Sequence, residues 1–283
     1  MKNYKTKRIT GKVIYHIFTF LFAFIMIYPL LWMVMGSFKD TTEIFKSAQK
    51  LLPSSFDFTN YKIGWQGFAG YTFAIFFKNS LIIAGLSTIG AVISSSIVAF
   101  GFARCNFKFK SLWFGCMLVA MMLPFQVIMI PQYILFNKMG WVGTYLPIIV
   151  PQFFGQGFFI FLNIQFIKGI PIDLDEAAYM DGCSIYKIFV QIILPLIKPA
   201  LVTSAIFSFM WRWDDFLAAL LYLSDPLKYP VSYALKMFAD PTAGSDWGAM
   251  FAMATLSLLP IFFIFLTMQK YLVEGIASTG IKG

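Results

Sequence analysis

The chain has 283 residues, of which 59% are hydrophobic and only 12% charged, and its mean hydropathy is +0.75. A soluble core of this size would need more polar surface than the composition supplies, which excludes an ordinary water-soluble protein. The net charge of +9 does not indicate nucleic-acid binding, because the basic residues flank apolar runs and form no stripe interleaved with aromatic residues.

Six apolar runs are long enough to cross a bilayer as helices. They cover about residues 13–35, 80–103, 112–130, 145–167, 200–222 and 248–269. The segments between them are too short for a second domain, so we predict an all-α fold with six transmembrane helices and a single membrane domain over 1–283. On the side that holds both termini, about 65 residues contain 13 Lys and Arg, against 8 in about 82 residues opposite. That excess predicts cytoplasmic termini.

Two features of the later spans concern packing and solute contact. Small residues at four-residue intervals in the second span indicate close packing, within this chain or against a second subunit: Ser87, Ala91, Ser95, Ala99 and Ala103. Polar residues spaced to share one face in the fourth and fifth spans predict a translocation face: Gln152, Gln156, Asn163, Ser208, Arg212 and Asp215. Trp211 and Trp213 add aromatic rings of the kind on which sugars stack, although Trp is equally typical of membrane interfaces. A self-satisfied Arg212–Asp215 pair is the alternative to a cavity.

The segment 168–198 between the fourth and fifth spans is polar and has helix signals of its own. Asp173 is predicted to cap a two-turn helix with Glu176 three residues later, in a capping box. Gly182 supplies a left-handed exit, and Ser184 caps a second helix. A folded polar segment between membrane spans indicates a surface for a partner.

Residues in this segment resemble the EAA loop of bacterial ABC importer permeases. The matching residues are Glu176-Ala177-Ala178, Gly182 and Ile193-Leu194-Pro195, and Asp181 and Phe189 resemble the carbohydrate-importing branch. Further matches are Met122-Leu123-Pro124, Gln126-Val127, Ile130-Pro131, Ile170-Pro171, the tail Tyr271-Leu272-Val273-Glu274-Gly275 and Gly280-Ile281-Lys282-Gly283, which is similar to the maltose-type second permease. The fifth-span WRWDDF also resembles the family pattern, with Asp214 where Asn is common.

The resemblance implies a type I permease of the bacterial cell membrane that carries a carbohydrate, as an oligosaccharide. It implies four kinds of partner: a second homologous permease, two cytoplasmic ATPase subunits, an extracytoplasmic sugar-binding protein and the lipid bilayer. Residues implied to couple to the ATPase are Asp175, Glu176, Ala177, Ala178, Asp181 and Gly182. In the cytoplasmic tail 270–283, the three glycines of the last nine residues fit an extended chain between the ATPase subunits, which implicates Gly275, Gly280 and Lys282.

Enzyme chemistry finds no support in the residues. His16 lacks a second ligand at metal-binding spacing, and Cys105, Cys116 and Cys183 form no C-x-x-C pair, so neither a metal site nor a catalytic site is predicted. The segment Gly275 to Lys282 misplaces the lysine of a phosphate loop and has no helix after it. Any ATP and Mg²⁺ are therefore expected on the separate ATPase subunits, with no cofactor in this chain.

Two other functions remain open from the sequence. An ion-coupled secondary transporter is one, although the spans contain no cluster of acids or bases apart from Arg212, Asp214 and Asp215. An ABC permease for a solute other than a sugar is the second. Which sugar is carried, and which of the two permeases holds it, is also left open.

Overall fold

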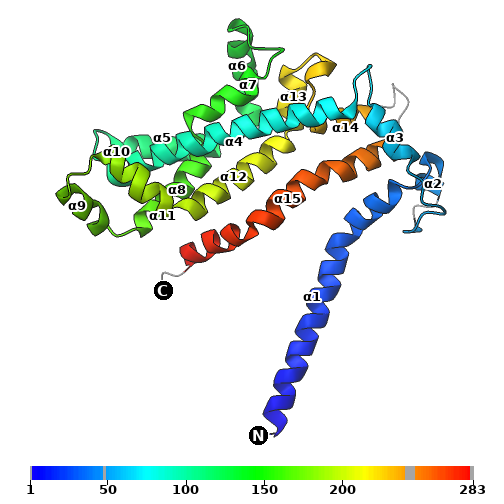
Figure 1. Cartoon of the computed structure of the whole chain (residues 1–283), viewed down its shortest axis with the longest axis horizontal. Coiled ribbons are helices and arrows are strands. Elements are labelled where there is room, and N and C mark those ends of the chain that lie inside the picture. The colour runs from blue at the N-terminus through cyan, green and yellow to red at the C-terminus, as the bar shows by residue number, and fades with distance from the viewer. Residues whose placement is uncertain (1, 47–48, 240–245, 281–283) are drawn as a thin grey trace. The chain divides into compact units, whose positions relative to one another are not determined.

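A computed structural model describes residues 2–46, 49–239 and 246–280, with side chains described over 11–46, 49–239 and 246–271. The described residues form helices and no strand, apart from one isolated bridge between Phe68 and Tyr71 (Figure 1). They form two compact units, one of residues 1–67 and 235–257 and the other of residues 68–234 and 258–283. Helices α14 (Val231–Phe238) and α15 (Trp247–Gly280) each have residues in both units. The division into units therefore does not decide whether residues 1–283 form one membrane domain, which stays a prediction.

The first unit contains α1 (Lys2–Gly36), α2 (Thr41–Lys46) and α3 (Thr59–Gln66) with parts of α14 and α15. The buried Asn60 side chain joins its helix to the end of α1, donating to the carbonyl oxygens of Ser37 at 2.9 Å and Lys39 at 2.7 Å. Asp246 accepts the Ala249 backbone N–H at 2.9 Å at the start of α15. These amide and carboxylate contacts fix the ends of helices that are otherwise apolar.

The second unit holds the remaining helices. They are α4 (Phe73–Arg104), α5 (Lys110–Met122), α6 (Phe125–Lys138), α7 (Leu146–Ile149), the 3₁₀ helix η1 (Val150–Phe154), α8 (Gly157–Gly169), α9 (Asp173–Met180), α10 (Ile185–Ile188), the π-helix η2 (Phe189–Ile193), α11 (Leu194–Leu196), α12 (Lys198–Trp213), α13 (Phe216–Tyr222) and the 3₁₀ helix η3 (Pro226–Lys228). The second half of α15 adds the last segment.

Helix α4 is the packing centre of this unit and lies beside both α8 and α12 (Figure 1). Its stripe of small residues is buried: Ser87, Ala91, Ser95 and Ala99 have no exposed surface, and Ala103 is half-buried. Small side chains let helix backbones approach closely, so dispersion contacts hold these helices together where apolar surroundings give little hydrophobic driving force. The stripe is therefore used within this chain, one of the two predicted possibilities.

The six expected spans correspond to four long apolar helices and two bent helix pairs, which make six if each pair counts as one span. The segment expected to span the membrane over 112–130 is not one straight helix, because α5 and α6 are bent by 100° relative to each other. Leu123 there is extended (φ −72°, ψ 120°), as the residue before Pro124 must be to avoid the proline ring. The helix expected over 200–222 also breaks, since α12 ends at Trp213 and α13 begins at Phe216.

The predicted extended tail is likewise wrong over the described residues. Helix α15 continues without interruption to Gly280, so Gly275 and Gly280 are helical and Lys282 lies outside the described residues. A glycine costs only about 0.5–1 kcal/mol in a helix relative to alanine, and three glycines do not by themselves require an extended chain.

The loop 223–230 is fixed to the first turns of α4 by buried polar side chains. The Asn79 side chain donates to the carbonyl oxygens of Leu227 at 2.8 Å and Tyr229 at 3.0 Å, while Ser80 Oγ accepts the Val231 backbone N–H at 2.8 Å. Burial and a hydrogen bond with Tyr233 raise the pKa of Tyr229 to about 12, so this phenol stays neutral at physiological pH. Charged side chains of the loop add to this: Lys228 Nζ donates to the Gly143 carbonyl oxygen at 2.7 Å, and Asp225 Oδ1 accepts the Leu227 backbone N–H at 3.0 Å.

Replacing Asn79 by leucine should destabilise the second unit. The change leaves two carbonyl oxygens unpaired, at about 1–3 kcal/mol each. The midpoint of thermal unfolding in detergent should fall, and protease should cut the 223–230 loop faster. Leu81→Ala, on the exposed side of the same turn, is the matched control and should change little. Equal stability of Asn79→Leu and the parent protein would contradict this account.

Candidate functional site

Helix α9 carries the Glu-Ala-Ala segment and has the predicted two turns, with eight residues. Gly182 leaves it with φ of +78°, and Ser184 caps α10 by accepting the Lys187 backbone N–H at 3.4 Å, so both predictions are confirmed. The predicted capping box does not form. Ile172 already has helical dihedrals (φ −66°, ψ −26°), and α9 begins at Asp173. The Asp173 carboxylate therefore lies in the first turn, where a negative charge interacts favourably with the helix dipole.

The two faces of α9 have different surroundings. Asp175 and Ala178, three residues apart, are buried, and Ala178 packs in an apolar cluster with residues that include Ile167 and Ile188. Helical spacing turns both towards the chain itself, so the structure does not favour direct contact of these two residues with a partner, and their part in coupling stays a prediction. Glu176, Ala177, Asp181 and Gly182 are exposed, as a contact surface requires.

A buried ion pair joins α9 to the end of α4. Arg104 Nε lies 2.7 Å from Asp175 Oδ2, and both side chains are more than nine-tenths buried. The same guanidinium donates through a terminal nitrogen to the Ile170 carbonyl oxygen at 2.8 Å. Arg104 thus joins the end of α8 to the segment that carries Glu176-Ala177-Ala178. The sequence did not predict this role.

Large apolar side chains surround the exposed acids of this segment. Met180 is 88% exposed and Tyr186 80%, and Leu174 and Tyr179 are also exposed. Apolar side chains gathered on one small surface are typical of a protein contact. We define this surface, Glu176, Tyr179, Met180, Asp181 and Tyr186, as the α9 face. Its apolar members were missed from the sequence, where they read as ordinary helix residues.

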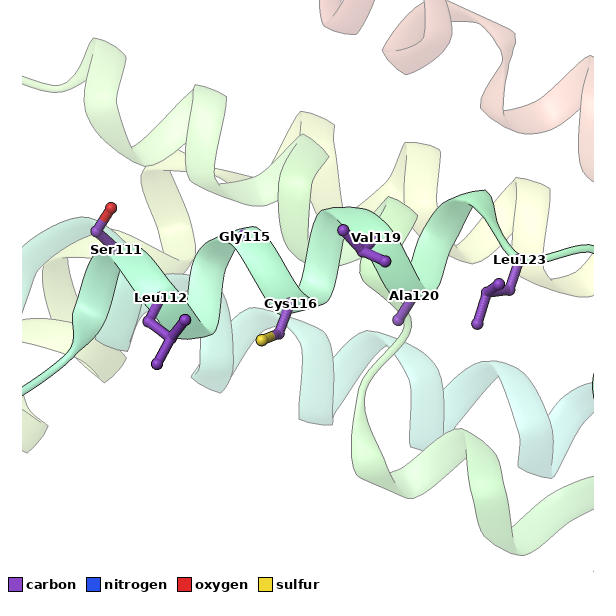
Figure 2. A pocket seen from close by; sticks show the side chains of 7 residues that line it. All are labelled: Ser111, Leu112, Gly115, Cys116, Val119, Ala120 and Leu123. Carbon is purple, nitrogen blue, oxygen red and sulfur yellow. The ribbon is translucent and has the colours of Figure 1, made fainter.

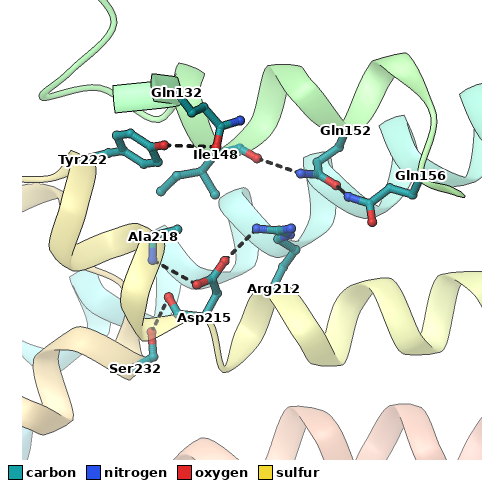
Figure 3. Close-up of polar contacts among 9 residues, drawn as sticks. All are labelled: Gln132, Ile148, Gln152, Gln156, Arg212, Asp215, Ala218, Tyr222 and Ser232. Atoms are coloured by element: carbon teal, nitrogen blue, oxygen red, sulfur yellow. Dashed lines mark hydrogen bonds and ion pairs between the residues drawn. The ribbon is translucent and has the colours of Figure 1, made fainter. Parts of the chain in front are cut away.

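A cavity of about 430 Å³ lies among α6, α7, η1, α12 and α13. Its lining includes four of the six residues predicted for a translocation face: Gln152, Gln156, Arg212 and Asp215. Figure 3 shows the two glutamines and the Arg212–Asp215 pair projecting towards the same space from different segments. Gln132 and Tyr222 also line it, and sequence spacing did not find them because they lie on other helices.

The polar side chains of the cavity are organised by hydrogen bonds (Figure 3). Arg212 Nη1 lies 2.6 Å from Asp215 Oδ2, while Asp215 Oδ1 accepts the Ala218 backbone N–H at 3.0 Å and caps α13. Gln156 donates through its side chain to Gln152. Arg212 has further donors beyond its bond to Asp215, so the pair is satisfied and can still offer donors to a solute.

Asn163 and Ser208 do not belong to the cavity lining. Both are buried, and the amide atoms of Asn163 have no hydrogen-bond partner among the described residues. The predicted common face of Gln152, Gln156 and Asn163 is wrong because the backbone is not one helix there. Gly155 has φ of +87°, which ends η1 and starts α8 afresh.

Of the two tryptophans of the fifth span, one lines the cavity and the other does not. Trp211 lines the cavity, is 47% exposed and stacks on Phe159 with ring centroids 5.3 Å apart. Trp213 is buried and stacks on Phe209, away from the cavity lining. Of the two tryptophans, only Trp211 therefore offers its ring to a solute in this cavity.

A second hollow, of about 730 Å³, runs along α5 (Figure 2). Its lining contains no charged side chain: Ser111, Leu112, Gly115, Cys116, Val119, Ala120 and Leu123. Such a surface suits an apolar neighbour, whether lipid or helix, and lacks the donors and acceptors that a polar solute needs.

Comparison with known proteins identifies the family. The family model described as "Binding-protein-dependent transport system inner membrane component" matches residues 91–278. The chain belongs to this family. It is 36% identical over 275 residues to the probable ABC transporter permease protein YurM of Bacillus subtilis (strain 168), covering 96% of this chain and 89% of the relative.

A second relative and a solved structure agree with this assignment. The chain is 31% identical over 265 residues to the trehalose/maltose transport system permease protein MalG of Thermococcus litoralis, covering 93% of this chain and 94% of the relative. Its fold matches a chain of a bacterial ABC transporter involved in the import of the acidic polysaccharide alginate, with a TM-score of 0.81, 21% identity and coverage of 94% and 97%. The chain is an all-α membrane permease of an ABC importer, a transport subunit and not an enzyme.

Cysteine labelling can test which predicted residues line the cavity. In a background without Cys105, Cys116 and Cys183, Gln156→Cys and Asp215→Cys should react with a charged methanethiosulfonate in the nucleotide-free permease. Asn163→Cys and Ser208→Cys should react at least about tenfold more slowly, because a buried thiol lacks both access and the water that stabilises thiolate. Equal rates at all four positions would rule out this division.

Proposed function

We propose that this permease carries an oligosaccharide inward, together with a second homologous permease, two cytoplasmic ATPase subunits and an extracytoplasmic sugar-binding protein. The observation that carries the proposal is the cavity in which Trp211 stands beside Gln152, Gln156, Arg212 and Asp215. Sugars present apolar faces that stack on aromatic rings and hydroxyls that bond to amides and charged groups. The name of the relative from Thermococcus litoralis, a trehalose/maltose permease, supports the same solute class.

The proposed energy source lies outside this chain, on ATPase subunits that bind ATP and Mg²⁺. The α9 face is the proposed contact with them, because its acids and its exposed apolar residues suit a groove that is basic at its rim and apolar within. Ala177 and Gly182 are exposed and small, so they let a partner backbone approach closely. A second proposed contact consists of the helical residues Gly275 and Gly280 and of Lys282, which lies outside the described residues.

The proposed orientation places α9 and both termini in the cytoplasm of a bacterial cell, and the 223–230 loop outside. Arg104, Lys110, Lys168 and Lys198 all lie where helices of the second unit meet the α9 segment. Basic residues at one end of membrane helices mark the cytoplasmic side. The ion-coupled alternative loses its basis with the family assignment, and a solute other than a sugar remains the alternative to test.

The α9 face predicts a charge-dependent contact with the ATPase. Glu176→Lys should weaken co-purification of the ATPase subunits by about tenfold or more, because it puts a cation where a basic partner is expected. Glu176→Gln should have a smaller effect. Gln66→Lys, exposed on α3 and predicted to lie outside the cell, also introduces a lysine and should not affect the contact. Undiminished co-purification with Glu176→Lys would remove α9 from the interface.

The cavity predicts that aromatic contact contributes to uptake of an oligosaccharide. The assembled importer in proteoliposomes should accumulate members of an oligosaccharide panel, whereas amino acids and polyols should not enter. Trp211→Ala should lower uptake roughly 2- to 12-fold, matching the 0.5–1.5 kcal/mol of an aromatic contact. Trp211→Phe should retain most of it. Trp113→Ala, on an exposed part of α5, is the control. Uptake of a non-sugar solute alone would refute the solute class.

A further inference from the structure

Arg104 makes two contacts that join three segments at one end of the second unit. Its Nε is 2.7 Å from Asp175 Oδ2 in α9, and a terminal nitrogen donates to the Ile170 carbonyl oxygen at 2.8 Å, directly after α8. Arg104 is also the last residue of α4. The planar guanidinium can hold two acceptors at fixed angles, so it defines both the position and the direction of α9.

Stability alone does not explain this ion pair. Desolvating two charges is costly, and well-packed apolar residues of similar volume are commonly as stabilising as a buried pair. The neighbouring cluster around Ala178, Ile167 and Ile188 shows that apolar packing is already present at this place. What a charge pair adds is a single allowed arrangement, because any shift of α9 would leave one charge buried and unpaired.

The other end of the same connection reaches the cavity. Ser95, nine residues before Arg104 and therefore about 13–14 Å along the helix, accepts the Gln156 backbone N–H at 3.0 Å. Ser94 Oγ lies 3.0 Å from the Gln152 carbonyl oxygen. Both glutamines line the cavity. These bonds hold the irregular backbone between η1 and α8, which has no regular helix of its own to fix it.

The helix between these two sets of contacts is suited to move as one body. Helix α4 has 32 residues and contains no proline, and it packs against α8 and α12. A continuous helix without proline that is packed through small residues can transmit a displacement along its axis. Movement of α9 would therefore reach Gln152 and Gln156 through Arg104, Ser94 and Ser95.

We propose that Arg104 is a positioning residue for transport: its bond to Asp175 ties the coupling helix to α4, and α4 passes the movement of α9 to the backbone of the cavity. This inference rests on the proposed coupling role of α9. Asp175 thereby has a function different from that of Glu176 one residue later. Glu176 faces the partner, and Asp175 faces the chain's own helix.

The test follows the cavity and not solute uptake, so it needs no knowledge of the solute. Gln156→Cys, in a background without native cysteines, keeps the backbone N–H that Ser95 accepts and reports access to the cavity. Its reaction rate with a charged methanethiosulfonate is measured in the assembled complex, with and without ATP trapped by vanadate. The parent complex should show a clear difference between the two rates, because alternating access changes the exposure of the cavity.

Arg104→Gln and Asp175→Asn should bring the ratio of these rates to about one, while the ATPase subunits still co-purify and hydrolyse ATP. The exchanged pair, Arg104→Asp with Asp175→Arg, should recover at least part of the difference, since the opposite charges meet again. Lys110→Gln is the matched control, a nearby cation at the start of α5 whose Nζ donates to the Cys105 carbonyl oxygen at 2.9 Å. It should leave the ratio unchanged.

Three outcomes would overturn the inference: a normal rate ratio in both single variants, an assembled exchanged pair with no recovery, or an equal loss with Lys110→Gln. If the single variants fail to assemble, the exchanged pair and Arg104→Lys decide in the same way. Failure of the coupling face itself has a different signature, because Glu176→Lys would then keep both the ATPase and the rate ratio. If Glu176→Lys abolishes the difference in labelling rates and Arg104→Gln does not, only the proposed role of the Arg104–Asp175 ion pair is rejected.

Discussion

The close approach of helices along α4 is the constraint on which the second unit depends. Residues of zero exposed surface at four-residue intervals make one side of this helix nearly flat, and α8 and α12 lie against it. Larger side chains at Ser95 or Ala99 would separate the backbones and break the hydrogen bond that the Gln156 N–H donates to Ser95 Oγ. The small residues of α4 thus determine how closely the backbone that carries Gln152 and Gln156 can approach this helix, and with it the position of these two side chains in the cavity.

Polar groups within this unit are concentrated at three places, and each has its own reason. At the end where α4 begins, Asn79 and Ser80 satisfy the backbone of a loop, and at the α9 end Arg104 forms an ion pair with Asp175, whose Oδ1 has no hydrogen-bond partner among the described residues. Between them lies the cavity, whose groups are only partly satisfied by one another. A membrane interior makes unpaired polar groups costly, so polar groups that keep spare donors mark the place where a solute replaces water.

The sequence predicted these features unequally. Composition and run length were enough for the helical membrane fold, and Gly182 and Ser184 marked local turns correctly because such signals act within a few residues. The burial of Asp175 and Ala178 was not predicted, because a motif shows which residues occur together and not which face of the helix each one occupies. Asn163 was misplaced because a spacing of seven indicates one face only along an unbroken helix, and Gly155 breaks it. Arg104 needed tertiary contacts to be recognised.

The breaks in the helices explain why the cavity lies where it does. Non-helical backbone at membrane depth is tolerated only where protein covers it or where it lines a water-filled space. Three of the breaks, at Leu123–Pro124, at Gly155 and between Trp213 and Phe216, have lining residues directly beside them: Phe125, Gln156, Arg212 and Asp215. A helix that ends there frees N–H and C=O groups, and Asp215 accepts one of these N–H groups at the start of α13. Interrupted helices thus create the polar environment of the cavity, and they leave short segments whose dihedrals can change when the long helices move.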